Sequence, residues 1–179
     1  MEYSISLVVI FWIIRIFESV SGFDLYFLGI YPRTTTGLPG IITAPFIHAN
    51  FDHLIANTLP FLSLSFLLFL FYKKKAGSVF VLLWITAGFF TWLIGRPAWH
   101  IGASIMIYAL AFFLFFGGIM SKKFLLILLS IGIIILYGGL IWGILPVAGQ
   151  ISWEGHLSGA ASGLVWAYKF RKEIRRVRN

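Results

Sequence analysis

Long apolar runs, separated by short polar stretches, make up most of the chain. None shows the alternation of apolar and polar residues that a transmembrane β-barrel requires. The six runs cover roughly residues 4–21, 53–72, 78–95, 102–120, 123–144 and 153–170. Each is close to the ~20 residues with which an α-helix crosses the hydrocarbon core of a bilayer. Because a backbone in lipid must satisfy its hydrogen bonds internally, the pattern predicts an all-α integral membrane protein with six transmembrane helices.

The connection between the first two runs is much longer than the others. It covers residues 21–52 and still contains Leu, Ile, Phe and Tyr. Long connections of this kind are typically functional or embedded in the membrane interface. No internal repeat and no second domain is visible. We therefore predict a single membrane domain over residues 1–179, with a long, partly embedded loop between its first two helices.

Composition agrees with a membrane protein and narrows the chemistry. The chain is 60% hydrophobic and 11% charged, which excludes an ordinary soluble domain. It has no cysteine, so disulfides and cysteine-based metal or redox sites are excluded. The net charge of +8 would suggest a nucleic-acid partner in a soluble protein. Here the basic residues lie between apolar runs, so we expect contact with membrane lipid and no nucleic acid.

The basic residues also predict an orientation. They gather in the connections at residues 73–75 and 122–123 and in the tail at residues 169–178. By the positive-inside rule these segments are cytoplasmic, which places both termini inside and the long loop outside. We expect a multi-pass protein, with a bacterial inner membrane as the location that its compactness favours. The oligomeric state stays open at this point.

Polar residues that lipid-facing helices avoid occur at the starts of the second, fourth and sixth runs. Those three runs all point from outside to inside, so their starts share one depth below the outer surface. This layer holds His48, His53 and Asn57, then His100 and Ser104, and finally His156. It includes all four histidines of the chain. Ionisable groups at membrane depth are costly and by default indicate a functional site.

The residue types in this layer fit nucleophilic acyl transfer. Ser104 would be the nucleophile, at a helix N-terminus that suits a developing oxyanion and behind the small residue Gly102. His156 would be its general base. His53 and Asn57 share a helix face and would donate hydrogen bonds to the oxyanion together with the Ser104 backbone N–H. No aspartate is well placed as a third member, so we predict a Ser–His dyad.

Two alternatives use the same histidines. His100 lies four residues before Ser104 and is a rival base. A metal site could be built from the four histidines, since imidazole suits zinc. No H-E-x-x-H pattern is present, however, and the carboxylates are badly spaced for ligands. We therefore expect no metal and no cofactor.

The remaining polar residues have structural interpretations. We expect His48 to brace the long loop. Asp52 is expected to be the N-cap of the second helix. Arg15 and Glu18, three residues apart in the first run, are expected to pair with each other or to reach the interface.

Three segments carry a family resemblance. They are "GIITAPFIHANFDHLIANTLPF", "GRPAWHIGASIMIYALAFF" and "SWEGHLSGAASGL", in the second, fourth and sixth runs. In this order and content they resemble the rhomboid intramembrane serine proteases. The resemblance implies a six-helix rhomboid-like bundle whose first loop is partly embedded. It also implies an endopeptidase that takes the transmembrane helix of a membrane protein as its substrate.

The resemblance also implies roles for particular residues. The family's nucleophile falls on Ser104 and its sixth-span histidine on His156. The oxyanion residues fall on His53 and Asn57. The family's tyrosine beside the catalytic histidine falls on Tyr108, and its ridge of small residues falls on Gly159 and Gly163.

One position departs from the family pattern. Ile105 stands where the family has a glycine directly after the nucleophile. A β-branched side chain adds volume at a tight contact, and overpacking typically costs about 1–3 kcal/mol. We therefore expect a weakened dyad and a higher turnover on Ile105→Gly. The alternative is a pseudoprotease that binds transmembrane helices without cutting them.

Overall fold

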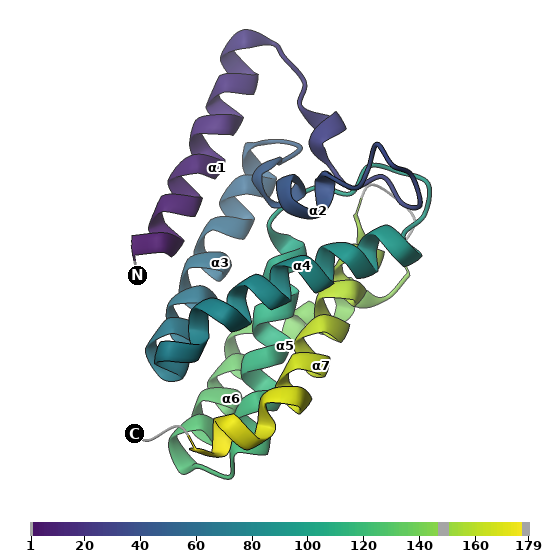
Figure 1. The fold of residues 1–179 in the computed structure, drawn as a ribbon. Helices are drawn as coiled ribbons and strands as arrows, with labels where there is room; N and C mark the ends of the chain where they lie inside the picture. Colours follow the sequence, from purple (N-terminus) through teal and green to yellow (C-terminus); the bar gives the residue numbers. More distant parts are fainter. Residues whose placement is uncertain (1, 147–150, 177–179) are drawn as a thin grey trace.

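The computed structural model describes residues 2–146 and 151–176, and within them it is a bundle of six long helices (Figure 1). The helices are α1 (Glu2–Ser21), α3 (Phe51–Tyr72), α4 (Ala76–Ile94), α5 (Ser104–Ser121), α6 (Phe124–Tyr137) and α7 (Trp153–Arg176). The described residues form no strand, only an isolated bridge between Ile30 and His100. The predicted all-α membrane bundle is therefore confirmed.

α5 is the central helix of the bundle. Most of its side chains are buried, and α3, α4, α6 and α7 all pack against it. α7 approaches it most closely, because Gly159 faces the carbonyl oxygen of Ile105 and Gly163 faces that of Ala109. A Cβ at either glycine would collide with the α5 backbone. The small-residue ridge thus allows α7 to lie directly on α5.

The long loop is folded rather than extended. It contains two 3-10 turns, η1 (Tyr26–Leu28) and η2 (Ala44–Phe46), and the short helix α2 (Gly40–Thr43). Ile30 and His100 exchange backbone hydrogen bonds of 2.9 and 2.8 Å, and the Gly102 N–H donates to the Ala44 carbonyl at 2.9 Å. The loop therefore holds the segment that leads into α5.

Among the described residues, four apolar stretches are long and apolar enough to cross a membrane. They are Tyr3–Ser21, Phe51–Ile94, Ser104–Ser121 and Phe124–Ile144. The second contains α3 and α4, joined by the 3-10 turn η3 (Lys73–Lys75). The sixth predicted run forms α7, but small, polar and basic residues leave that helix less apolar than the others. The fifth run also differs from expectation, because after Tyr137 it continues as the 3-10 segment η4 (Gly138–Ile144).

The basic clusters lie at one end of the bundle. The α3–α4 turn, the α5–α6 turn and the end of α7 gather at the lower end of Figure 1, and the starts of α5 and α7 lie at the opposite end. The Arg175 side chain donates to the Met120 carbonyl at 3.1 Å and ties the end of α7 to that of α5. The polar helix starts and the lysine-rich turns are thus on opposite sides of the molecule.

Candidate active site

The starts of α3, α5 and α7 surround a cavity of about 840 Å³. Its lining includes five residues that the sequence predicts for the site, namely His53, Asn57, Ser104, Tyr108 and His156. They come from three segments far apart in the chain. The structure therefore brings these side chains to one pocket at the polar end of the bundle.

Ser104 and His156 are hydrogen-bonded to each other. Ser104 is the first residue of α5, and its Oγ lies 3.0 Å from His156 Nε2. The other ring nitrogen, Nδ1, lies 2.9 Å from the carbonyl oxygen of Gly143 in η4. A carbonyl can only accept, so Nδ1 carries the proton and Nε2 presents a lone pair to the serine hydroxyl. This is the tautomer that a general base for Ser104 requires.

Gly143 is a site residue that sequence reasoning missed. Its carbonyl orients His156, which in a catalytic triad is done by a carboxylate. Because every residue has a carbonyl, no side-chain pattern could have revealed it. A Cβ at Gly143 would collide with the Tyr108 hydroxyl and would lie 3.2 Å from His156 Nδ1. Glycine is thus the residue that lets η4 approach the histidine.

Tyr108 lies flat against the imidazole. The ring centroids of Tyr108 and His156 are 4.2 Å apart and the rings are 8° from parallel. Tyr108 follows Ser104 by one helical turn, so both face α7. The stacking leaves the His156 ring little freedom to rotate away from Ser104.

His53 and Asn57 lie on the cavity face of α3, opposite Gly102. Gly102 has a φ of +106°, which an L side chain rarely adopts. A Cβ there would also lie 2.7 Å from His53 Cε1. One amide hydrogen of Asn57 is donated to the His53 carbonyl at 2.8 Å. The second amide hydrogen is left to donate to another acceptor.

The N-cap of α3 differs from the prediction. The cap is Asn50, whose side-chain oxygen accepts the His53 N–H at 2.8 Å. Asp52 lies exposed in the first turn, where its charge still favours the helix N-terminus. The prediction that Asp52 caps the helix is therefore wrong. Both residues are good capping types, and the sequence alone favours neither.

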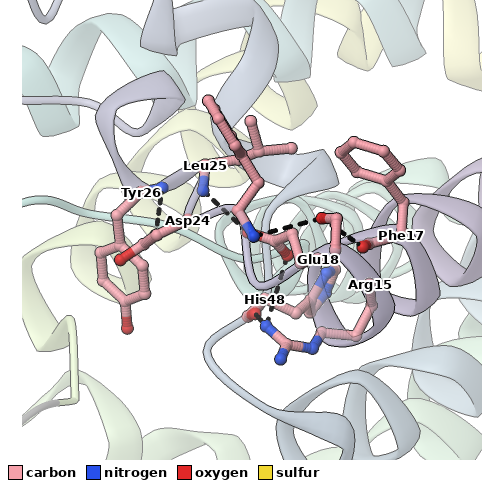
Figure 2. Close-up of polar contacts among 9 residues, drawn as sticks. Arg15, Phe17, Glu18, Asp24, Leu25, Tyr26 and His48 are labelled. Carbon is pink, nitrogen blue, oxygen red and sulfur yellow. Dashed lines mark hydrogen bonds and ion pairs between the residues drawn. The ribbon is translucent and has the colours of Figure 1, made fainter.

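His48 connects the long loop to the segment before Ser104. Its ring is buried, and its Nε2 accepts the Ala103 N–H at 3.4 Å. Figure 2 shows how its backbone is held, since Arg15 donates to the His48 carbonyl at 3.2 Å and pairs with Glu18 at 3.3 Å. Glu18 in turn accepts the Leu25 N–H at 3.0 Å. The expected Arg15–Glu18 pair is thus present, and both of its residues also hydrogen-bond to the backbone of the long loop.

Ile105 is accommodated without moving Ser104 away from His156. The side chain is 2% exposed and points at Gly155, where a Cβ would lie 3.0 Å from Ile105 Cγ1. The expected overpacking is relieved because α7 has a glycine at this contact. No sequence signal singled out Gly155 as the partner of Ile105, since the contact depends on how α7 is rotated against α5.

Neither alternative use of the histidines matches the geometry. No group of three His, Asp or Glu side chains in residues 2–146 and 151–176 is arranged to hold a metal ion. His100 faces Ser152 rather than Ser104, with 2.6 Å between its Nδ1 and the Ser152 Oγ. A second cavity, of about 660 Å³ between α1 and α4, has no histidine in its lining.

The matches to known proteins include every residue of this cavity's proposed Ser–His site. The family model for the Rhomboid domain matches residues 36–173. A protein of Mycobacterium tuberculosis, named as uncharacterized, is 38% identical over 183 residues, which are 97% of this chain and 76% of that protein. A protein of Mycobacterium leprae, also named as uncharacterized, is 37% identical over 177 residues, 93% of this chain and 70% of that protein.

Proposed function

Because the chain belongs to the rhomboid family, we propose that it is an intramembrane serine endopeptidase. Its substrates would be the transmembrane segments of single-pass membrane proteins. The observation that carries the proposal is the 3.0 Å contact between Ser104 Oγ and His156 Nε2, with the imidazole held in the basic tautomer by Gly143. A buried serine that served only packing would need no such oriented partner.

The first half-reaction forms an acyl-enzyme. The Ser104 hydroxyl proton passes to His156 Nε2 while Oγ attacks the scissile carbonyl. The carbonyl oxygen becomes an oxyanion, which the Ser104 backbone N–H and the His53 and Asn57 side chains would stabilise. Collapse of this intermediate breaks the C–N bond, and the proton on His156 goes to the leaving amine.

The second half-reaction hydrolyses the ester. His156, again neutral, takes a proton from a water molecule as its oxygen attacks the Ser104 ester. The ester C–O bond then breaks and the proton returns to Ser104 Oγ. This step needs water inside the membrane domain. The polar residues that line the cavity at the starts of α3, α5 and α7 support access for that water from the outer side.

The cavity also suits an extended peptide from a transmembrane helix. Besides the polar groups it is lined by apolar residues, including Ala56 and Pro60 of α3 and Leu140 of η4. These elements belong to membrane-spanning stretches, so a substrate could reach Ser104 from the lipid side. We place the protein in a bacterial inner membrane with its termini inside.

The proposal is tested with purified protein in liposomes and a single-pass substrate. Cleavage is expected with the wild type and is expected to fall by about a thousandfold or more in Ser104→Ala and His156→Ala. A fluorophosphonate that reacts with activated serines should label the wild type at Ser104 and neither variant. Equal cleavage by all three proteins would refute the proposal.

The second candidate is a pseudoprotease that binds transmembrane helices without cutting them. Ile105 favours it, because the family pattern has glycine at this position. The same experiment separates the two functions. Binding of the single-pass substrate without cleavage, and without labelling of Ser104, would support the pseudoprotease.

A further inference from the structure

A second Ser–His hydrogen bond lies beside the first, with the roles of the two segments exchanged. His100 Nδ1 is 2.6 Å from Ser152 Oγ. His100 precedes Ser104 by four residues, and Ser152 precedes His156 by four residues. Two Ser–His hydrogen bonds therefore join the same two segments. In one the histidine belongs to the segment before α5, and in the other it belongs to α7. Neither His100 nor Ser152 has a role in the proposed reaction.

The hydrogens of this second pair have defined directions. His100 Nε2 lies 3.1 Å from the Arg96 carbonyl, which can only accept, so Nε2 carries the proton. Nδ1 is then the acceptor and the Ser152 hydroxyl is the donor. The Ser152 oxygen also accepts the Gly155 N–H at 3.3 Å. Burial lowers the pKa of His100, which keeps the neutral ring that this arrangement needs.

Arg96 makes two further contacts with the residues at the start of α7. Its guanidinium lies 3.3 Å from the Glu154 carboxylate and donates to the Ile151 carbonyl at 2.9 Å. The Glu154 side chain is only 4% exposed. The Arg96 side chain is 34% exposed, so the pair joins a buried carboxylate to a half-buried guanidinium and connects the two segments.

Ser152 is connected directly to the catalytic candidate. The His156 N–H donates to the Ser152 carbonyl at 3.1 Å. A shift of Ser152 therefore moves the backbone that carries the imidazole. On the α7 side, the contacts from His100 and Arg96 fall on Ile151, Ser152 and Glu154, all within the five residues before His156.

We propose that His100 and Ser152 are positioning residues, which clamp the first turn of α7 to the segment before α5 and so set the distance between Ser104 Oγ and His156 Nε2. The inference rests on the proposed protease function. It gives both residues a positioning role alone, although Ser152 also lines the cavity. A displacement of about 1 Å between reacting groups can lower a rate by about a hundredfold, so loss of one clamp bond should be measurable.

The first test compares kinetic constants in liposomes. Ser152→Ala and His100→Ala are expected to lower kcat about tenfold and to leave KM within about twofold. Ser152→Thr keeps the hydroxyl and should restore most of kcat. Ser130→Ala is the matched control, because Ser130 is also buried and its hydroxyl donates to the Phe115 carbonyl at 2.8 Å, far from the cavity. An unchanged kcat in Ser152→Ala would overturn the inference.

The two positioning residues should also act as one unit. The double variant His100→Ala, Ser152→Ala is expected to lose less kcat than the product of the two single losses, because both single variants remove the shared hydrogen bond. A loss in the double variant equal to the product of the two single losses would overturn the inference. Labelling of Ser152 by a fluorophosphonate, located by mass spectrometry, would also overturn it and would make Ser152 a nucleophile instead.

A second measurement does not depend on activity. In protein with ¹⁵N-labelled histidine, the Nε2 signal of His156 reports its hydrogen bond to Ser104. Ser152→Ala is expected to shift this signal, and Ser130→Ala to leave it in place. An unmoved His156 signal in Ser152→Ala would overturn the inference even in a protein that cuts nothing. A shifted signal without any cleavage would support the clamp and refute the protease.

Discussion

At the residue scale, His156 is oriented by a neutral group. The Gly143 carbonyl fixes the tautomer, as a carboxylate does in a triad, but it offers only a partial negative charge. Hydrogen bonds to an ionised partner are roughly twice as strong as neutral ones. The imidazolium of the proposed acyl transfer would therefore be stabilised less here. Stacking on Tyr108 adds rigidity instead, so the site relies more on fixed geometry than on charge.

The structure reverses the expected effect of replacing Ile105 by glycine. The buried Ile105 side chain fills the space beside Gly155, so Ile105→Gly should leave a cavity and add a glycine to a helix. We expect this change to cost about 4 kcal/mol of stability and not to raise turnover. Thermal unfolding in detergent and cleavage in liposomes would measure the two effects. A faster and equally stable variant would show that Ile105 is a handicap.

The partner of Ile105 can be tested in the same assay. Gly155→Ala places a Cβ 3.0 Å from Ile105 Cγ1 and 2.6 Å from Ser152 Oγ. It should therefore destabilise the wild type more than it destabilises Ile105→Gly, where the first of these contacts is absent. Equal losses in both backgrounds would mean that the two residues do not compensate each other.

His48 should make the fold sensitive to acid. Burial lowers the pKa of His48 from 6.5 to about 3, so below pH 6.5 the unfolded chain binds a proton that the folded chain excludes. Stability is then lost as the pH falls, by about 2 kcal/mol at about pH 5. Unfolding temperatures from about pH 7.5 to 5 would measure the slope. His48→Gln should reduce the slope and leave the part contributed by His100, whose pKa burial also lowers. An unchanged slope would contradict the assignment to His48.

The candidate site could be predicted to the extent that it depends on side-chain type. His53, Ser104 and His156 are conspicuous because polar groups at helix starts inside a membrane are costly. Gly143 contributes a carbonyl, which has no signature in a sequence. Ser152 acts through a contact with His100 that only the packing of α7 on α5 creates. The sequence therefore predicts the candidate reacting residues, but not the groups that orient them.

At the element scale, the lengths of the apolar runs predict where the helices are. They do not predict the residue at which each helix begins or ends. A run of about 20 apolar residues predicts a helix across the bilayer, whichever way it packs. η4 departs from this pattern, since glycines at 138, 139 and 143 weaken the preference for an α-helix and the segment tightens into a 3-10 form. That change brings Gly143 to His156. The least regular element thus has a direct effect on the site.

The contact of α7 with α5 should depend on single glycines. Gly159→Ala would place a Cβ against the Ile105 carbonyl and 3.0 Å from Tyr108 Cβ, and is expected to cost about 2 kcal/mol or more. Gly132→Ala in α6 is the matched control, because no atom lies within 4 Å of its Cβ position. It should instead add up to ~1 kcal/mol from helix propensity. Detergent unfolding measures both, and a harmless Gly159→Ala would contradict the close packing.

At the scale of the whole molecule, the basic clusters and the candidate active site lie at opposite ends of the bundle. Lysine-rich turns and the end of α7 are at one end of the bundle, and the starts of α5 and α7 are at the other (Figure 1). The cavity, whose lining includes His53 and His156, lies at these helix starts. Positive charge is retained on the cytoplasmic side of a membrane. The cavity is therefore expected to open outward, which would give water its access from the outside and would separate the cleaved products across the bilayer.

This orientation can be measured cleanly because the chain has no cysteine. Thr36→Cys introduces a thiol in the long loop, and Lys74→Cys introduces one in the turn η3; both positions are exposed. In intact cells a membrane-impermeant maleimide should label Thr36→Cys and not Lys74→Cys, and after permeabilisation it should label both. The cysteine-free parent gives the background. Labelling of Lys74→Cys alone in intact cells would reverse the orientation, so that a cytoplasmic cavity would have to draw its water, and release its products, from inside the cell.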